Sequence, residues 1–280
     1  MKHIRITEKT GTLDFGYSCV PFHFLNPHEI VLFDSGMKPM PGIFDQLDAD
    51  GIRVAAVLHT HLHDDHMGNN AIIRERYGAA FFAHEREIAF AEEVRQGGDV
   101  RYRSFDRASV TPFDDSCREL VIQDTAFRLL PTPGHSAGHT AFLTPDGVCC
   151  VGDCFISGKF LAISKIPYMQ NIEASLTSML QLADTTYPLY ITSHKGPVAQ
   201  DQLKKVIFDN ILLTSRLSLS VAELADRPIR RDVLADRVFE KLKLTHLRDV
   251  EWICFMVDRH IDKALARRML TERNGLLCKK

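Results

Sequence analysis

The sequence HTHLHDDH occupies residues 59–66 and directly follows the apolar run VAAVL at residues 54–58. Four imidazoles and two carboxylates within eight residues are side chains that bind divalent metal ions. The apolar run predicts a buried strand whose end delivers this polar cluster to the edge of a sheet. A histidine-rich loop without a metal is the alternative interpretation, so the other motifs of the chain must decide between the two.

Other potential ligands follow apolar runs in the same way. Strand ends can aim several loops of a scaffold at one point, and such a point is where binding residues gather. The positions are Asp34 after residues 29–33, His135 and His139 in TPGHSAGHT after residues 126–130, Asp153 after residues 148–151, and His194 after residues 189–192.

The spacing within residues 59–66 predicts two neighbouring metal sites. Side chains alternate along an extended segment, so His61 and His63 lie on the same side while Asp65 and His66 must reach elsewhere. These nitrogen and oxygen donors suit zinc most simply, and iron or manganese would also accept them. We expect a first ion on His61, His63 and His135, a second on Asp65, His66 and His194, and Asp153 as a bridge between them.

The series Asp34, His61-x-His63-x-Asp65-His66, His135, Asp153 and His194 resembles the five-motif signature of the metallo-β-lactamase superfamily. The resemblance spans most of residues 13–197. It implies an α/β (α+β) fold, the αββα sandwich, with two similar halves and a metal centre at the rim of the packed sheets. It also implies that Asp34 supports the site without binding metal and that His139 makes hydrogen bonds within its own loop.

The order of the expected elements fits two halves followed by an appended region. Strands and helices alternate up to residue 96, and short β-like runs joined by the tight turn PDG at residues 145–147 follow from about residue 120. Beyond Pro197 the apolar spacing predicts helices over 199–217, 219–226, 229–243 and 246–273. We therefore predict a catalytic domain over residues 1–198 and a C-terminal helical region over 199–280, which acts as a lid, a dimerisation surface or a winged-helix-like module.

Composition narrows the class of protein. The chain has 280 residues, 45% of them hydrophobic and 25% charged, as in ordinary soluble proteins. A net charge of -2 argues against a general nucleic-acid binder, because such affinity comes from concentrated Lys and Arg. We find no signal peptide and no apolar run of about 20 residues, so we expect a cytoplasmic protein without a membrane span. Seven cysteines without a CxxC motif fit reduced thiols.

The resemblance implies metal-assisted hydrolysis. A water held between two cations is a nucleophile at neutral pH, since metal binding lowers its pKa from about 16 to near 7. Asp65 would be the catalytic residue that binds metal and also orients the nucleophile or passes on a proton. The expected substrate is a small ester, thioester or lactone, in the manner of glyoxalase II or the lactonases, and the expected cofactor is two zinc ions.

Three other classes of function stay open at this point: a nuclease, a redox enzyme with iron, and a non-catalytic protein. A nuclease that cleaves RNA or another phosphodiester would find basic residues in the C-terminal region, for example Arg230, Arg231, Arg267 and Arg268, although the net charge counts against it. A persulfide dioxygenase would use a similar fold with one iron. Diiron reductases carry a carboxylate where this chain has His63, which weakens that option. The intact set of expected ligands argues against a non-catalytic member of the family.

The residues around the expected site offer further candidates. The loop over residues 154–170 leaves directly from Asp153 and could wall a substrate pocket, with Tyr168 hydrogen-bonding a developing oxyanion or simply packing under the next helix. Cys154 and Lys195 lie next to expected ligands and could tune the site. The apolar stripe Ile253, Val257, Ile261 and Leu265 needs a partner surface, either in the same chain or in a homodimer.

Overall fold

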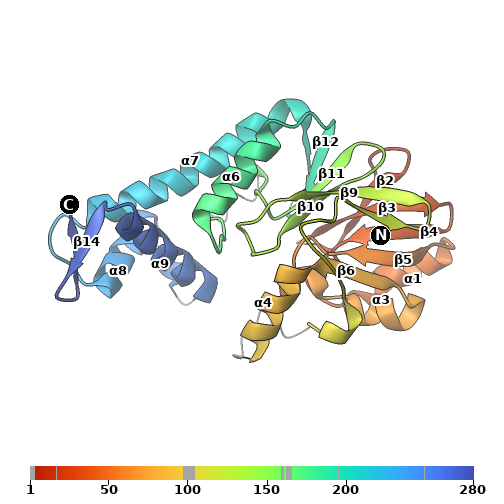
Figure 1. The fold of residues 1–280 in the computed structure, drawn as a ribbon, viewed down its shortest axis with the longest axis horizontal. Helices are drawn as coiled ribbons and strands as arrows, with labels where there is room; N and C mark the ends of the chain where they lie inside the picture. The colour runs from red at the N-terminus through yellow and green to blue at the C-terminus, as the bar shows by residue number, and fades with distance from the viewer. Residues whose placement is uncertain are drawn as a thin grey trace.

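A computed structural model describes residues 4–16, 18–96, 105–158, 161, 166–194, 196–248 and 250–280. Two β-sheets lie face to face, with helices on both outer faces (Figure 1). Lys195 and residues 159, 160 and 162–165 of the expected substrate loop lie outside the described residues. Within the described part of the chain, no helix has the length and apolar character needed to cross a membrane.

The first sheet contains seven strands in chain order. Its antiparallel part is β1 to β4, and the later pairs β4–β5, β5–β6 and β6–β7 are parallel. The strands are β1 (Ile4–Arg5), β2 (Thr10–Asp14), β3 (Cys19–Asn26), β4 (Glu29–Phe33), β5 (Arg53–Leu58), β6 (Ala80–His84) and β7 (Thr111–Phe113). The helices of this half are α1 (Pro41–Ala49), α2 (Asp64–Met67), α3 (Asn70–Tyr77) and α4 (Glu85–Gln96).

The second sheet contains six strands in the order β13-β12-β11-β10-β9-β8. Only the pair β11–β12 is parallel, and α6 (Ile172–Ala183) lies between these two strands in the sequence. The strands are β8 (Glu119–Ile122), β9 (Thr125–Pro131), β10 (Thr140–Leu143), β11 (Val148–Gly152), β12 (Leu189–Thr192) and β13 (Gly196–Ala199).

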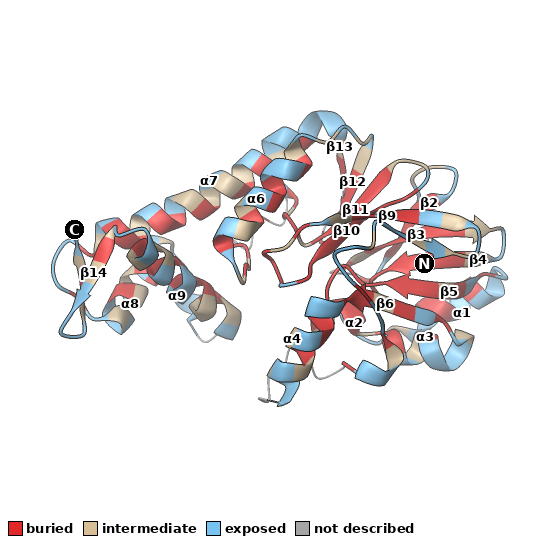
Figure 2. Ribbon diagram, in the orientation of Figure 1, coloured by how far each residue is buried: buried red, intermediate tan, exposed pale blue. Residues whose placement is uncertain are grey.

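Three apolar clusters correspond to the three interfaces between layers. One cluster lies between the sheets and joins side chains of the first, such as Phe33 and Leu58, to side chains of the second, such as Phe127 and Phe142. Another packs α1, α3 and α4 on the outer face of the first sheet, and the third packs α6 and the C-terminal region on the second. Figure 2 shows that most residues of the central strands are buried. The predicted αββα sandwich is therefore confirmed.

The C-terminal region is carried by the 25-residue helix α7 (Gln200–Leu224), which extends away from the sandwich (Figure 1). Its far end packs against α8 (Arg231–Lys241) and α9 (Glu251–Ala266). The stripe residues Ile253, Val257 and Ile261 are buried in this contact, so their partner surface lies in the same chain. The division into two domains stays a prediction, as does a homodimer.

Two expectations for this region were wrong. The two helices expected over 199–217 and 219–226 are one helix, Gln200–Leu224, because nothing between them interrupts helical spacing. The helix expected over 246–273 begins at Glu251, ends at Ala266 and is followed by the hairpin β14 (Leu270–Arg273) and β15 (Leu276–Lys279). Asn274 and Gly275 have φ of 51° and 74°, the left-handed conformation that a two-residue hairpin turn requires. This Asn-Gly signal was present in the sequence and overlooked.

The contact between the sheets yields a stability prediction. Phe142 of β10 is fully buried, and its ring centroid lies 5.8 Å from that of Phe33 and 6.1 Å from that of Phe113, both in the first sheet. We expect Phe142→Ala to lower the free energy of unfolding by about 3–5 kcal/mol, because it leaves a cavity between the layers. Phe208→Ala, at a position 65% exposed, is the matched control and should change stability little. Urea denaturation in the presence of a chelator measures both; equal effects would contradict this account of the core.

Candidate metal centre

The expected ligands gather at one edge of the two sheets. Asp34 follows β4 and residues 59–66 follow β5, while Asp153 follows β11 and His194 lies just beyond β12. Each of these strand pairs is parallel, so the carboxyl ends of the two strands meet at the same edge. A hydrogen bond of 2.9 Å from the N–H of Thr140 to the carbonyl oxygen of Thr60 ties the two sheets together there.

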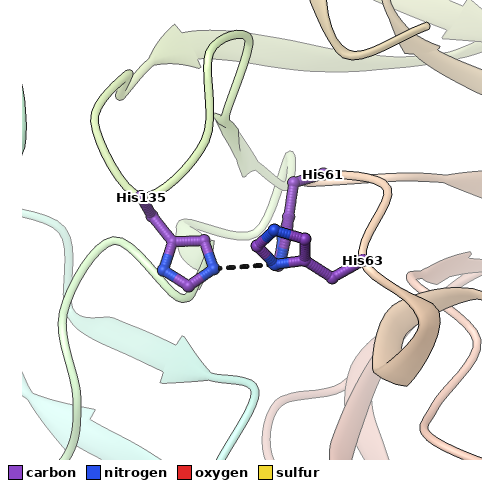
Figure 3. Close-up of side chains that lie close together, drawn as sticks. All are labelled: His61, His63 and His135. Carbon is purple, nitrogen blue, oxygen red and sulfur yellow. Dashed lines mark hydrogen bonds between the residues drawn. The ribbon is translucent and has the colours of Figure 1, made fainter. Parts of the chain in front are cut away.

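His61, His63 and His135 form the three-histidine group. One ring nitrogen from each lies within 4.8 Å of the others, and all three side chains are buried. Figure 3 shows rings from two different loops pointing toward one another. The Nε2 atom of His135 lies 3.1 Å from Nδ1 of His63. The structure thus brings together the three side chains expected to bind the first ion.

Asp65, His66, Asp153 and His194 form the mixed group, which lies beside the first. Oδ2 of Asp153 is 3.6 Å from Nε2 of His66, 3.3 Å from Nε2 of His194 and 3.8 Å from Nε2 of His135. Oδ2 of Asp65 lies 3.7 Å from Nε2 of His66 and 3.6 Å from Nε2 of His194. One carboxylate therefore lies near side chains of both groups, the position expected of Asp153.

The donor atoms fit metal ions. Nε2 of His61 and Nε2 of His66 are buried and have no hydrogen-bond partner among the described residues. An unsatisfied buried polar atom costs about 1–3 kcal/mol, so two of them at one place indicate a missing partner. A divalent cation accepts the lone pair of neutral imidazole and balances the carboxylates of the mixed group. The residues present thus suit two neighbouring divalent ions.

Asp34 positions one histidine of each group through hydrogen bonds on the side of the ring opposite Nε2. Its carboxylate accepts hydrogen bonds of 2.8 Å from the N–H and the hydroxyl of Thr60 and lies 2.9 Å from Nδ1 of His66. The hydroxyl oxygen of Thr60 lies 3.0 Å from Nδ1 of His61. A proton on Nδ1 of each histidine leaves Nε2 available to a metal. Asp34 also belongs to a third possible ligand set with His61 and His66, but its oxygens are occupied by these hydrogen bonds.

His139, for which the resemblance implied hydrogen bonds within its own loop, contacts Thr132 of that loop and also the backbone at Asp153. Its Nδ1 lies 2.8 Å from the hydroxyl of Thr132, and its Nε2 accepts a hydrogen bond of 3.2 Å from the N–H of Asp153. Burial, with the neighbouring His135, lowers the pKa of His139 to about 3. It is therefore a neutral imidazole that holds the backbone at Asp153. His59, the first residue of the cluster, lies 3.0 Å from the side-chain amide of Asn70 and is no member of either group.

The two groups differ in electrostatic character. Burial and the neighbouring histidines hold the pKa of His61 well below its usual value, which keeps it neutral. Burial alone would lower the pKa of His66, but the carboxylates of Asp65, Asp34 and Asp153 raise it well above the usual value. His61 therefore offers a neutral imidazole, as does His135, whose pKa burial also lowers, while the acids of the mixed group favour positive charge on His66 and His194. Both properties suit cation binding.

Tyr168 lies beside the three-histidine group. Its ring centroid is 5.3 Å from those of His63 and His135, and its carbonyl oxygen lies 3.1 Å from Nδ1 of His135. On its other side the ring stacks on Phe255 of α9, with centroids 5.5 Å apart and an interplanar angle of 23°.

Cys154, which follows Asp153 in the sequence, is a buried side chain. Burial raises the pKa of Cys154 to about 12, so this thiol is a neutral core side chain.

Two residues near the site were missed in the sequence. Phe255 reaches Tyr168 from a helix 87 positions further along the chain, a distance at which no local pattern exists. Glu87 of α4 is 1% exposed and accepts hydrogen bonds from the N–H groups of Leu62 and Gly138, in the two loops that carry the three-histidine group. An acidic residue in the first turn of a helix looks like a solvated end group, although Glu87 shares its face of α4 with the apolar Ile88 and Ala91.

Curated proteins of similar sequence include proteins named as hydrolases. A hydroxyacylglutathione hydrolase of Thiobacillus denitrificans is 33% identical over 141 residues, which cover 50% of this chain and 48% of that protein. The chain thus spans about half the length of that relative. A probable metallo-hydrolase of Bacillus subtilis is 25% identical over 228 residues, covering 69% of this chain and 84% of the relative.

Solved structures share the whole architecture. A metallo-beta-lactamase family protein from Thermus thermophilus superposes with a TM-score of 0.75 at 18% identity, covering 99% of this chain and 100% of that one. A beta-lactamase domain protein from Burkholderia ambifaria gives 0.72 at 17% identity, covering 100% and 94%. The family model described as the metallo-beta-lactamase superfamily matches residues 24–194. This chain is therefore a member of the metallo-β-lactamase superfamily.

Proposed function

We propose that this metallo-hydrolase cleaves a small ester, thioester or lactone with two divalent ions, most simply zinc. The observation that carries the proposal is the pair of adjacent ligand groups, with Asp153 near side chains of both. The names of the relatives support the choice of substrate, since a hydroxyacyl group on the sulfur of glutathione is a thioester. Two bound divalent ions would supply an acidified water as nucleophile and polarise the substrate carbonyl.

The side chains around the site would divide the remaining tasks. Asp65 is 32% exposed, so its carboxylate can both face the mixed group and exchange a proton with solvent or substrate. Asp34 and Thr60 hold His61 and His66 with Nε2 presented to the site. Such prepositioned groups need no rearrangement during the reaction, and this lowers its barrier.

Tyr168 and Phe255 form the side of the site where we place the substrate. The two stacked rings continue outward from His63 and His135, and both side chains are half-buried. Such a surface favours an apolar portion of a small substrate beside the reacting carbonyl. The substrate would then contact both the sandwich and α9 of the C-terminal region.

Ion pairs among the described residues of the C-terminal region count against the nuclease alternative. Phosphate binding needs unneutralised cations on one face. Here Arg230 pairs with Asp232 at 2.6 Å, and Arg231 pairs with Asp258 and Asp262. Further cations are likewise paired with acids: Arg237, Lys241, Arg248, Lys263 and Arg267.

The proposal predicts metal-dependent turnover. Wild-type protein reconstituted with zinc should bind two ions and hydrolyse members of a thioester and lactone panel, while His61→Ala and Asp153→Ala should lose metal and at least about 100-fold in kcat/KM. His28→Ala, an exposed histidine in the turn between β3 and β4, is the control. Elemental analysis and steady-state kinetics measure these outcomes. Two bound ions without turnover of either class would exclude the proposed substrates, and a single iron would favour the dioxygenase.

The role of Asp34 predicts a coupled loss of metal. Asp34→Asn should weaken binding at both ligand groups by about 10–100-fold, because the amide cannot accept all the hydrogen bonds from Thr60 and His66. Competition with a chromophoric chelator measures the two affinities. Asp124→Asn, in the exposed turn between β8 and β9, is the control. Loss at one group alone would show that Thr60 does not transmit the effect to His61.

The ring pair predicts an effect on substrate binding. Phe255→Ala should raise KM several-fold and leave metal content and kcat nearly unchanged, because Phe255 stacks on Tyr168 and is not itself a member of either ligand group. Phe208→Ala removes a ring from the exposed face of α7 and should change neither constant. An unchanged KM in Phe255→Ala would place the substrate elsewhere.

A further inference from the structure

Glu87 is a buried carboxylate outside both ligand groups. It lies in the first turn of α4, is 1% exposed and forms no ion pair within the described part of the chain. Burial raises its pKa, although the hydrogen bond from Gly138 acts in the opposite direction. Burying a carboxyl group without a cation costs free energy, so what its oxygens contact indicates its use.

The two oxygens of Glu87 join the loops that supply the three-histidine group. Oε2 accepts a hydrogen bond of 3.2 Å from the N–H of Leu62, the residue between His61 and His63. Oε1 accepts one of 2.6 Å from the N–H of Gly138, in the loop between His135 and His139. One side chain thus fixes the backbones of two loops that come from different sheets.

The loop of Gly138 rests directly on the first turn of α4. A Cβ atom at Gly138 would lie 2.9 Å from Nδ1 of His84 and 3.0 Å from the backbone nitrogen of Glu87. Leu62 is fully buried in the apolar cluster beneath α4. Both loops are therefore held against the same helical turn, and the separation between them depends on it.

We propose that Glu87 is a positioning residue that sets the distance between the pair His61–His63 and His135, and thereby the metal affinity of the three-histidine group. This inference rests on the proposed metal centre. The geometry of a coordination site must be held closely, and residues behind the ligands commonly change metal affinity by about 10–100-fold when they are replaced.

The alternative is that Glu87 only stabilises the N-terminus of α4. A carboxylate in the first helical turn is favourable for that reason in any helix. Such a role would change the unfolding temperature and leave the ratio of the two metal affinities unchanged. The ratio is therefore the measurement that separates the two roles.

The experiment titrates metal-free protein with Zn²⁺ against a chromophoric chelator. Glu87→Gln keeps the size of the side chain but replaces one acceptor oxygen by an NH₂ group that faces an N–H. We expect it to weaken one of the two binding steps by about 10–100-fold and to leave the other within about threefold. The affected step should be the one lost in His135→Ala. Glu85→Gln, exposed in the same turn of α4, is the matched control.

A second variant tests the same contact from the loop. Gly138→Ala adds a methyl group against His84 and α4 without altering Glu87, and should weaken the same binding step. Thermal unfolding of the metal-free variants reports whether the fold is retained. The inference is overturned if both affinities in Glu87→Gln match those of Glu85→Gln, or if both steps weaken equally. A wild-type protein that binds no metal would instead contradict the proposed function.

Discussion

The hydrogen bonds of one buried carboxylate determine how this site is built. Asp34 forms hydrogen bonds with the backbone N–H and the hydroxyl of Thr60 and with Nδ1 of His66. The hydroxyl of Thr60 in turn contacts Nδ1 of His61, so Asp34 also positions His61 indirectly. Its own backbone has a φ of 68°, a conformation that is uncommon for residues other than glycine. A strained backbone of this kind persists where the surrounding contacts fix it. The conformation of Asp34 turns the end of β4 toward the cluster that follows β5.

The layers explain why ligands that are distant in the sequence meet. Each sheet contains a parallel strand pair, β4–β5 or β11–β12, from which the chain leaves at the shared edge, and the Thr140–Thr60 hydrogen bond joins the two sheets there. The C-terminal region then reaches the same edge. The N–H of Met169 lies 3.1 Å from the sulfur of Met256 in α9, next to the Tyr168–Phe255 stack. The appended region therefore contacts the segment that carries Tyr168, beside the three-histidine group.

The sequence singled out the side chains that the structure brings together, because their signal is local. Four of them lie within residues 61–66, and the others follow recognisable strands, so strand ends alone bring them near one another. Glu87 and Phe255 could not be found in this way, since each acts through a contact made only after the layers pack. The hairpin of β14 and β15 is a different case. Its Asn-Gly turn was visible, but the helical spacing of the preceding residues was extended across it.

Exposure distinguishes Asp65 from the other side chains of the two groups. The side chains of His66, His135, His194 and Asp153 are between 1% and 12% exposed, whereas Asp65 is 32% exposed. Buried ligands cannot exchange protons with solvent without moving, and their pKa values depend on the other charges of the site. Asp65 lies in the short helix α2 directly after the His-x-His segment, so its carboxylate lies at the surface of the mixed group. Residues 59–66 therefore supply buried histidines of both groups and the more exposed of the two carboxylates of the mixed group.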